Sequence, residues 1–144
     1  MKKAYYIPLA LAASLVFLSA PAQAQDESHV FLVTTWETLM PEGGSAAERN
    51  ASISQWTDEV TANNEYIVSQ THLRHLYGSD SGQWIVITEY RNWNDIEAAD
   101  QRDTELFLAH WTTPEEREEF NSTFGKYFGG HSDEIYSELS QFNK

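Results

Sequence analysis

Apolar and polar positions follow a strand-like pattern in three segments of the chain. Residues 29–37, 65–79 and 83–92 are rich in β-branched and aromatic side chains, which is typical of β-strands. The sequence Ser-Asp-Ser-Gly at 79–82 predicts a turn, so the second and third strands form a hairpin. The first and third strands carry apolar residues at both alternating positions, which predicts a sheet with two apolar faces.

Three other segments show helical signals. Ser45 and Glu48 are spaced as a capping box, and an apolar stripe at helical spacing follows and ends near residues 63–64. Residues 94–111 carry a second apolar face. Thr113 and Pro114 open a third helix, with Glu116 closing its capping box, because threonine caps and proline suits the first helical position. Phe120 and Phe124 belong to the buried stripe of that helix.

The end of the chain combines a turn signal with an ambiguous segment. Gly129 and Gly130 follow the third helix where a left-handed C-terminal cap is expected. Together with Asp133, whose side chain suits local backbone contacts, they predict a structural turn. Ile135 and Leu139 then fit a strand, and helical spacing fits them as well. We favour the strand.

The element order strand, helix, strand, strand, helix, helix, strand predicts an α+β fold. It corresponds to the ferredoxin-like βαββα(α)β arrangement with one antiparallel sheet. Helices cover one face of such a sheet, and no further segment is left to cover the other. A second copy of the chain is therefore the expected cover, giving a homodimer and a dimeric α/β barrel.

Residues 84–99 carry a family resemblance. The stretch Trp-Ile-Val-Ile-Thr-Glu-Tyr-Arg-Asn-Trp-Asn-Asp-Ile-Glu-Ala-Ala joins a strand with a glutamate near its end to an acidic helix start. It resembles the dimeric α/β-barrel superfamily and is similar to antibiotic-biosynthesis-monooxygenase-like small barrel proteins. The resemblance implies a barrel cavity. The superfamily includes enzymes, haem binders and proteins of no known activity. Fold alone does not decide among these functions.

The first 24 residues resemble a secretory signal peptide. Lys2 and Lys3 precede an apolar run at 4–18, and Ala22-Gln23-Ala24 is a small-x-small cleavage pattern. The alternative is a membrane anchor, but the run is shorter than the ~20 residues that a spanning helix needs. Residues 25–144 then form a single domain. The predicted destination is the periplasm or the extracellular space.

Charge and cysteine content narrow the function classes. The formal net charge is −13, and it becomes −15 without residues 1–24, because that segment holds two lysines and no acidic residue. Such a surface repels nucleic acid and anionic membranes. The chain has no cysteine, which excludes disulfides and thiolate metal sites. Neither a metal nor a cofactor is expected.

Histidines, aromatic residues and one glutamate are the candidates for a ligand pocket. An apolar pocket with a few polar groups is typical of small-molecule sites. His72 and His75 are three apart on one predicted strand, so they point to opposite faces. Glu89 or His75 is the candidate base, with cross-strand ion pairs as the alternative role. The candidates are His75, Trp84, Glu89, Tyr90, His110 and His131.

Three functions remain open at this point. The favoured one is a binding protein for a small aromatic or apolar molecule in the barrel cavity. The second is an oxygenase-like enzyme that works without a cofactor or with haem. The third is a dimeric interaction module without catalysis.

Overall fold

The elements follow the predicted order along the chain. The computed structural model describes residues 28–78 and 82–142, so the predicted signal peptide lies outside the described residues. The elements are β1 Val30–Thr38, α1 Ala46–Glu59, η1 Thr61–Asn63, β2 Ile67–Arg74, β3 Gln83–Tyr90, α2 Asn94–His110, α3 Pro114–Gly125, β4 Phe128–Ser137 and η2 Ser140–Phe142. The second strand is shorter than predicted, and the final segment is a strand as favoured. No helix within these ranges is long and apolar enough to cross a membrane.

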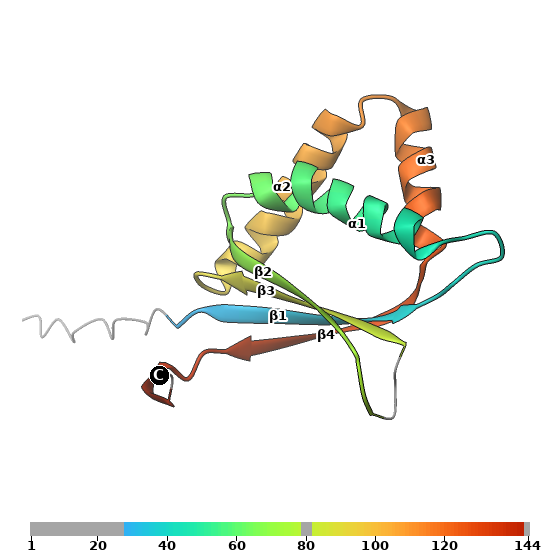
Figure 1. Cartoon of the computed structure of the whole chain (residues 1–144). Coiled ribbons are helices and arrows are strands. Elements are labelled where there is room, and N and C mark those ends of the chain that lie inside the picture. Colours follow the sequence, from blue (N-terminus) through green and yellow to red (C-terminus); the bar gives the residue numbers. More distant parts are fainter. Residues whose placement is uncertain (1–27, 79–81, 143–144) are drawn as a thin grey trace, which may run out of the picture.

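The strands form one antiparallel sheet in the order β2-β3-β1-β4. β1 pairs with β3 on one side and with β4 on the other, so Val33 lies opposite both Ile87 and Glu134. Figure 1 shows α1, α2 and α3 together on one side of this sheet. This topology confirms the ferredoxin-like βαββα(α)β prediction and the α+β class.

The main apolar core lies among the helices themselves. Val60, Trp111 and Phe120 are almost fully buried, with half-buried aromatic and leucine side chains packed around them. The rings of Trp111 and Phe120 have centroids 4.3 Å apart. Because the helices bury much of their apolar surface against one another, they do not fill all of the space above the sheet.

Helix α1 is capped through a tyrosine from the other end of the chain. Ser45 Oγ accepts from the Glu48 backbone N–H at 3.1 Å, as the predicted capping box requires. The reciprocal bond differs from the prediction, because the Ser45 N–H donates to the Tyr127 hydroxyl at 2.9 Å. That hydroxyl donates in turn to the Glu48 carboxylate, which also binds Lys126. The box at Thr113 and Glu116 is complete.

The turn predicted from Gly129, Gly130 and Asp133 is wrong, because all three residues lie within β4. Neither glycine has positive φ; among the described glycines only Gly43 (+75°) and Gly78 (+138°) do. Gly129 and Gly130 instead occupy a β-bulge, where the register between β1 and β4 shifts. The Asp133 carboxylate accepts from the Thr34 hydroxyl of β1 at 2.7 Å. Here pairing with β1 overrides the local preference for a helix cap.

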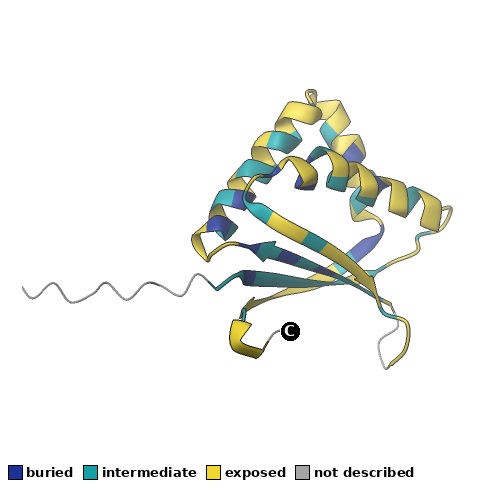
Figure 2. Cartoon of the chain, turned by 60° about the vertical axis from the view of Figure 1, so that its left-hand side comes forward, coloured by how far each residue is buried: buried dark blue, intermediate teal, exposed yellow. Residues whose placement is uncertain are grey.

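No α-helix of the described residues covers the second face of the sheet. Side chains alternate along each strand, so Phe31 and Val33 of β1 and Ile85 and Ile87 of β3 lie on this open face. Figure 2 colours much of the sheet as half-buried, and β4 is largely exposed. Leu73 of β2 is 44% exposed. The open face thus presents an uncovered apolar centre, as the double-sided pattern predicted.

The backbone conformation at the bulge predicts how well alanine is tolerated in place of Gly130. Gly130→Ala should leave the free energy of unfolding unchanged or raise it by up to about 1 kcal/mol, because φ is not positive and the added methyl meets no atom within 4 Å. Gly43→Ala, also unhindered in space, should lower it by roughly 1–2 kcal/mol because φ is +75°. Urea denaturation measures both. Equal losses in the two variants would contradict the bulge interpretation.

Candidate functional site

A cavity of about 470 Å³ lies between the helix-facing side of the sheet and the helices. Aromatic rings come from both layers. The sheet contributes Trp36, Trp84 and Tyr90, and the helices contribute Trp56, Phe120 and Phe124. Polar side chains enter from the strands and from α2 and α3; they are Thr34, Gln70, His72, Thr88, Asp100, Asp103, Asn121, His131 and Asp133, with Thr57 from α1.

Hydrogen bonds align four polar side chains along the cavity floor. Gln70 lies opposite Thr88 in the β2–β3 pair, and its Nε2 donates to Thr88 Oγ1 at 3.1 Å. The Gln70 carbonyl oxygen therefore faces His72, whose Nε2 lies 2.9 Å away and must carry the proton. This fixes the His72 tautomer and leaves Nδ1 as a proton acceptor. Tyr90 follows Thr88 on the same side of β3.

The His72 ring packs against an aromatic wall while the residue as a whole stays exposed. Its ring stacks on Trp84 with centroids 5.2 Å apart and planes at 26°. Burial lowers the pKa of His72 below its usual value, because the charged form loses hydration. This favours the neutral imidazole, whose Nδ1 can accept a hydrogen bond from a bound molecule.

Tyr90 lies at the opposite end of this line beside two carboxylates of α2. Burial raises the pKa of Tyr90 to about 12, and the negative charges of Asp103 and Asp100 add to the rise, while a hydrogen bond from Thr88 opposes it. Burial also raises the pKa of Asp103, although Asn64 Nδ2 donates to its carboxylate at 2.7 Å. This part of the cavity is thus both poorly hydrated and negatively charged.

The β1–β4 side of the cavity carries another aromatic and acidic group. The rings of Trp36 and His131 lie with centroids 4.1 Å apart. His131 Nε2 is 3.5 Å from Asp133 Oδ2, and the other oxygen of Asp133 accepts from Thr34. These contacts orient the Asp133 carboxylate along the cavity wall.

The structure brings together only part of the predicted pocket. Trp84, Tyr90 and His131 line the cavity. Glu89 lies on the open face of the sheet, where it contacts His29 Nδ1 at 2.5 Å and accepts from Ser69. It is separated from the cavity because neighbouring residues of a strand point to opposite faces.

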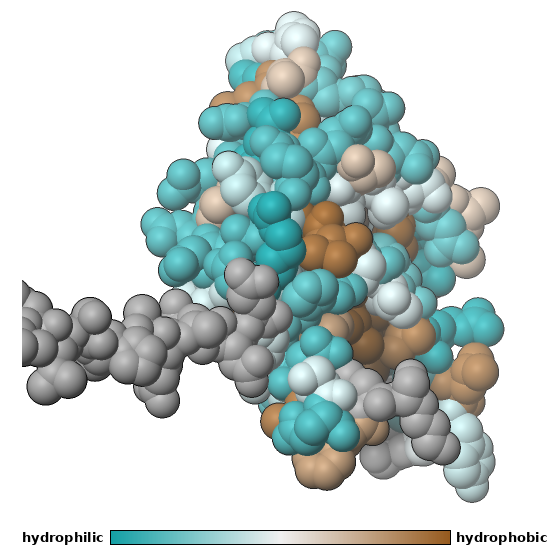
Figure 3. Space-filling model, turned by 90° about the vertical axis from the view of Figure 1, so that its left-hand side faces the viewer, coloured by the Kyte–Doolittle hydropathy of each residue, from teal (hydrophilic) through white to brown (hydrophobic). Residues whose placement is uncertain are grey.

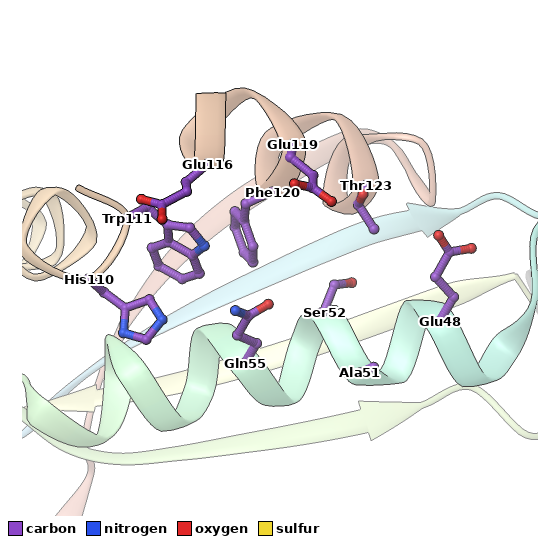
Figure 4. A pocket seen from close by; sticks show the side chains of 10 residues that line it. All are labelled: Glu48, Ala51, Ser52, Gln55, His110, Trp111, Glu116, Glu119, Phe120 and Thr123. Atoms are coloured by element: carbon purple, nitrogen blue, oxygen red, sulfur yellow. The ribbon is translucent and has the colours of Figure 1, made fainter. Parts of the chain in front are cut away.

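The two other predicted residues also lie elsewhere. His75 follows the end of β2, and its Nε2 is 2.5 Å from the Tyr77 carbonyl oxygen. His110 pairs with Glu59 at 2.9 Å and borders a separate groove of about 450 Å³ between α1 and α3. Figure 4 shows Gln55 and Ser52 of α1 facing Phe120 and the carboxylates of α3 across this groove.

Sequence reasoning missed Gln70, Thr88 and Asp103 and did not select His72 for the pocket. The pairing register of the β2–β3 hairpin could have identified the missed strand residues. Gln70 lies opposite Thr88, and both share the side of the sheet that carries Trp84. The position of Asp103 depends on how α2 packs, which no local pattern gives. No group of three or more metal-ligating side chains occurs among residues 28–78 and 82–142.

Solved structures share this fold. The chain is similar to a candidate antibiotic biosynthesis monooxygenase from Caulobacter crescentus (14% identity, 78% of this chain and 92% of that chain, TM-score 0.51). It is also similar to SnoaB, a cofactor-independent oxygenase from Streptomyces nogalater (10%, 81% and 99%, 0.52). A third similar structure is a nipsnap family protein of unknown function from Agrobacterium tumefaciens (8%, 78% and 90%, 0.53).

These similarities confirm the predicted ferredoxin-like fold. At such low identity they extend to the fold alone. No protein-family model matches the sequence, and the comparison with curated proteins gives no match.

The buried phenol predicts an alkaline loss of stability. Tyr90 has a pKa of about 12 when folded and 10 as the reference value, so the unfolded chain releases this proton first as the pH rises. Its stabilising contribution is complete below pH ~10 and lost by about pH 12, on the order of 2 kcal/mol. Urea unfolding between pH 8 and ~12 should show a shallower decline for Tyr90→Phe. The exposed Tyr77→Phe control should follow the parent protein; equal slopes for both variants would contradict the assignment.

Proposed function

We propose that the protein binds a small aromatic or apolar molecule in the cavity between the sheet and the helices. The observation that carries this proposal is the combination of aromatic rings from both layers with one hydrogen-bonded polar line. The volume of about 470 Å³ lies within the range of ~300–1,000 Å³ that is typical of small-molecule sites.

The two layers supply complementary contacts to such a molecule. The Trp84 ring packs against His72, with centroids 5.2 Å apart, and near Phe128, with centroids 4.9 Å apart, so it is positioned before any ligand arrives. Trp56 approaches from the helical layer. A flat ligand between these walls gains apolar burial and stacking. The polar line along Gln70 and Thr88 would then orient its hydrogen-bonding groups.

An oxygenase-like enzyme is the second candidate, and His72 is the observation that favours it. Its Nε2 proton is bound by Gln70, and its lowered pKa favours the neutral imidazole, so Nδ1 is the position that can take a proton from a bound hydroxyl or acidic C–H group. The resulting electron-rich anion could pass an electron to dioxygen. The similar fold of SnoaB, a cofactor-independent oxygenase, is compatible with this chemistry.

We also propose that two copies associate through the open sheet face. Its apolar centre includes Phe31, Val33 and Ile87, with Leu73 on the neighbouring strand. Figure 3 views the left-hand side of the molecule in Figure 1, with the sheet below the helices, and shows apolar side chains interrupting the hydrophilic surface in the middle and lower parts of that side. An apolar sheet face normally packs against a second layer, and a second copy supplies one.

Export is the remaining part of the proposal. It rests on residues 1–24, with their lysine pair, apolar run and small-residue cleavage pattern. The absence of cysteine means that the exported chain folds without disulfides. We propose the periplasm or the extracellular space as the place where the cavity meets its ligand.

The binding proposal predicts that 2-naphthol occupies one site per chain. Isothermal titration calorimetry should show saturable binding that Trp84→Ala weakens roughly fivefold or more, because a stacking wall is lost. Thr88→Val keeps the volume and removes the hydroxyl, and it should weaken binding by about two- to fivefold. Tyr77→Ala is the control, since Tyr77 is 96% exposed and lies outside this cavity lining.

One result would contradict the binding proposal, and another would support the oxygenase alternative. Unchanged affinity in Trp84→Ala and Thr88→Val would place the naphthol elsewhere. Uptake of dioxygen in the presence of the probe, abolished by His72→Gln, would support the oxygenase alternative.

The open face predicts a dimer in solution. Sedimentation of the chain without residues 1–24 should give about twice its mass at micromolar concentration. Val33→Asp should weaken association roughly 100-fold or more, because it buries an unpaired charge at the centre of the apolar face. Leu108→Asp is the control, since Leu108 is 49% exposed on α2. A monomeric parent protein would overturn the dimer proposal.

A further inference from the structure

The charge of the cavity wall points to a property of the ligand. Three carboxylates line the cavity, from Asp100, Asp103 and Asp133, and no lysine or arginine is among its described lining residues. His72 donates its Nε2–H to the Gln70 carbonyl oxygen, and partial loss of hydration lowers its pKa, which disfavours a compensating charge there. His131 lies beside Asp133 at 3.5 Å, and its positive charge would offset one carboxylate at most.

The nearest basic side chains bind other partners. Arg102 lies between Asp100 and Asp103 in sequence, yet it pairs with Glu65 at 3.0 Å and Glu105 at 2.9 Å. Arg91 pairs with Asp95 at 2.8 Å. Asp103 is bound by the neutral amide of Asn64 instead. The acidic end of the cavity thus retains its negative charge.

The three carboxylates act together on one buried ring. Asp103, Asp100 and Asp133 each disfavour the ionised form of Tyr90, so all lie close enough to Tyr90 to affect its charge. Tyr90 is only 6% exposed, and its ring belongs to the cavity wall. An aromatic face attracts a cation through its quadrupole, and carboxylates nearby strengthen that attraction.

We propose that the ligand is an organic cation, with an amine or quaternary ammonium group on an apolar or aromatic body. This inference rests on the proposed binding function and adds to it the charge of the ligand. The ammonium group would lie toward Tyr90 and the α2 carboxylates, and the body would lie between the tryptophans. A metal ion does not fit the described residues, because no three ligating side chains converge. Charge spread over several separated carboxylates suits a large, weakly hydrated cation better.

Two probes of almost identical shape test this preference. Phenyltrimethylammonium carries a positive charge, and tert-butylbenzene replaces its nitrogen with carbon. Calorimetry and tryptophan fluorescence at 0.5 M salt, where long-range surface attraction is screened, should show the cation binding about tenfold tighter or more. Asp100→Asn and Asp103→Asn should each weaken the cation roughly three- to tenfold and change the affinity for tert-butylbenzene less than about twofold.

A glutamate of the separate helix groove is the matched control. Glu119→Gln removes the same charge from the groove between α1 and α3, and it should leave both affinities unchanged. Asp100 is exposed, and its backbone oxygen rather than its carboxylate accepts from the Thr104 hydroxyl at 3.2 Å, so Asp100→Asn remains informative if Asp103→Asn fails to fold.

The outcomes separate this inference from the function on which it rests. Equal or tighter binding of tert-butylbenzene would overturn the charge preference and leave an apolar site in place. Loss of cation binding in Glu119→Gln, with the aspartate variants unaffected, would place the cation in the groove and also overturn the inference. If neither probe nor 2-naphthol binds, the binding function itself is wrong.

Discussion

The pairing of β1 on both of its edges is the constraint on which the rest of the structure depends. Its side chains alternate between two environments, with Leu32 and Trp36 facing the helices and Phe31 and Val33 facing outward. A slip of one residue would exchange the two sets, so both neighbouring strands must hold the same register. The cavity floor and the apolar open face are therefore two consequences of one alignment.

The helical layer explains why the space above that floor is only partly filled. Trp111 and Phe120 bury their apolar surface in contacts between helices. A layer that packs mainly on itself rests on the sheet at fewer points and leaves a hollow between them. The strand residues below this hollow are then free to carry polar groups such as His72 and Gln70, which a filled core would not tolerate unless fully paired.

Local patterns were enough to predict the element order, because strand alternation and helix caps are encoded within a few residues. Thr113 and Glu116 illustrate this, since their reciprocal bonds form as the spacing predicts. Local patterns could not predict the bulge at Gly129 and Gly130, because it arises from a register shift against β1, about 90 residues away. Trp84, Tyr90 and His131 were found through their chemistry. Excluding Glu89 from this set required knowledge of which face of the sheet meets the helices. Placing Asp103 in the cavity required knowledge of how α2 packs.

The Tyr127 hydroxyl ties the first helix to the last part of the chain. It accepts from Ser45 across 82 positions of sequence, while β4 pairs with β1 across a similar distance. Neither the cap of α1 nor the outer edge of β1 is complete until the C-terminal residues are present. A chain emerging from the ribosome would therefore lack its native topology until β4 has been synthesised, and nonlocal pairing of this kind slows folding. Such a delay leaves the apolar strand residues unpaired and accessible to other chains for longer.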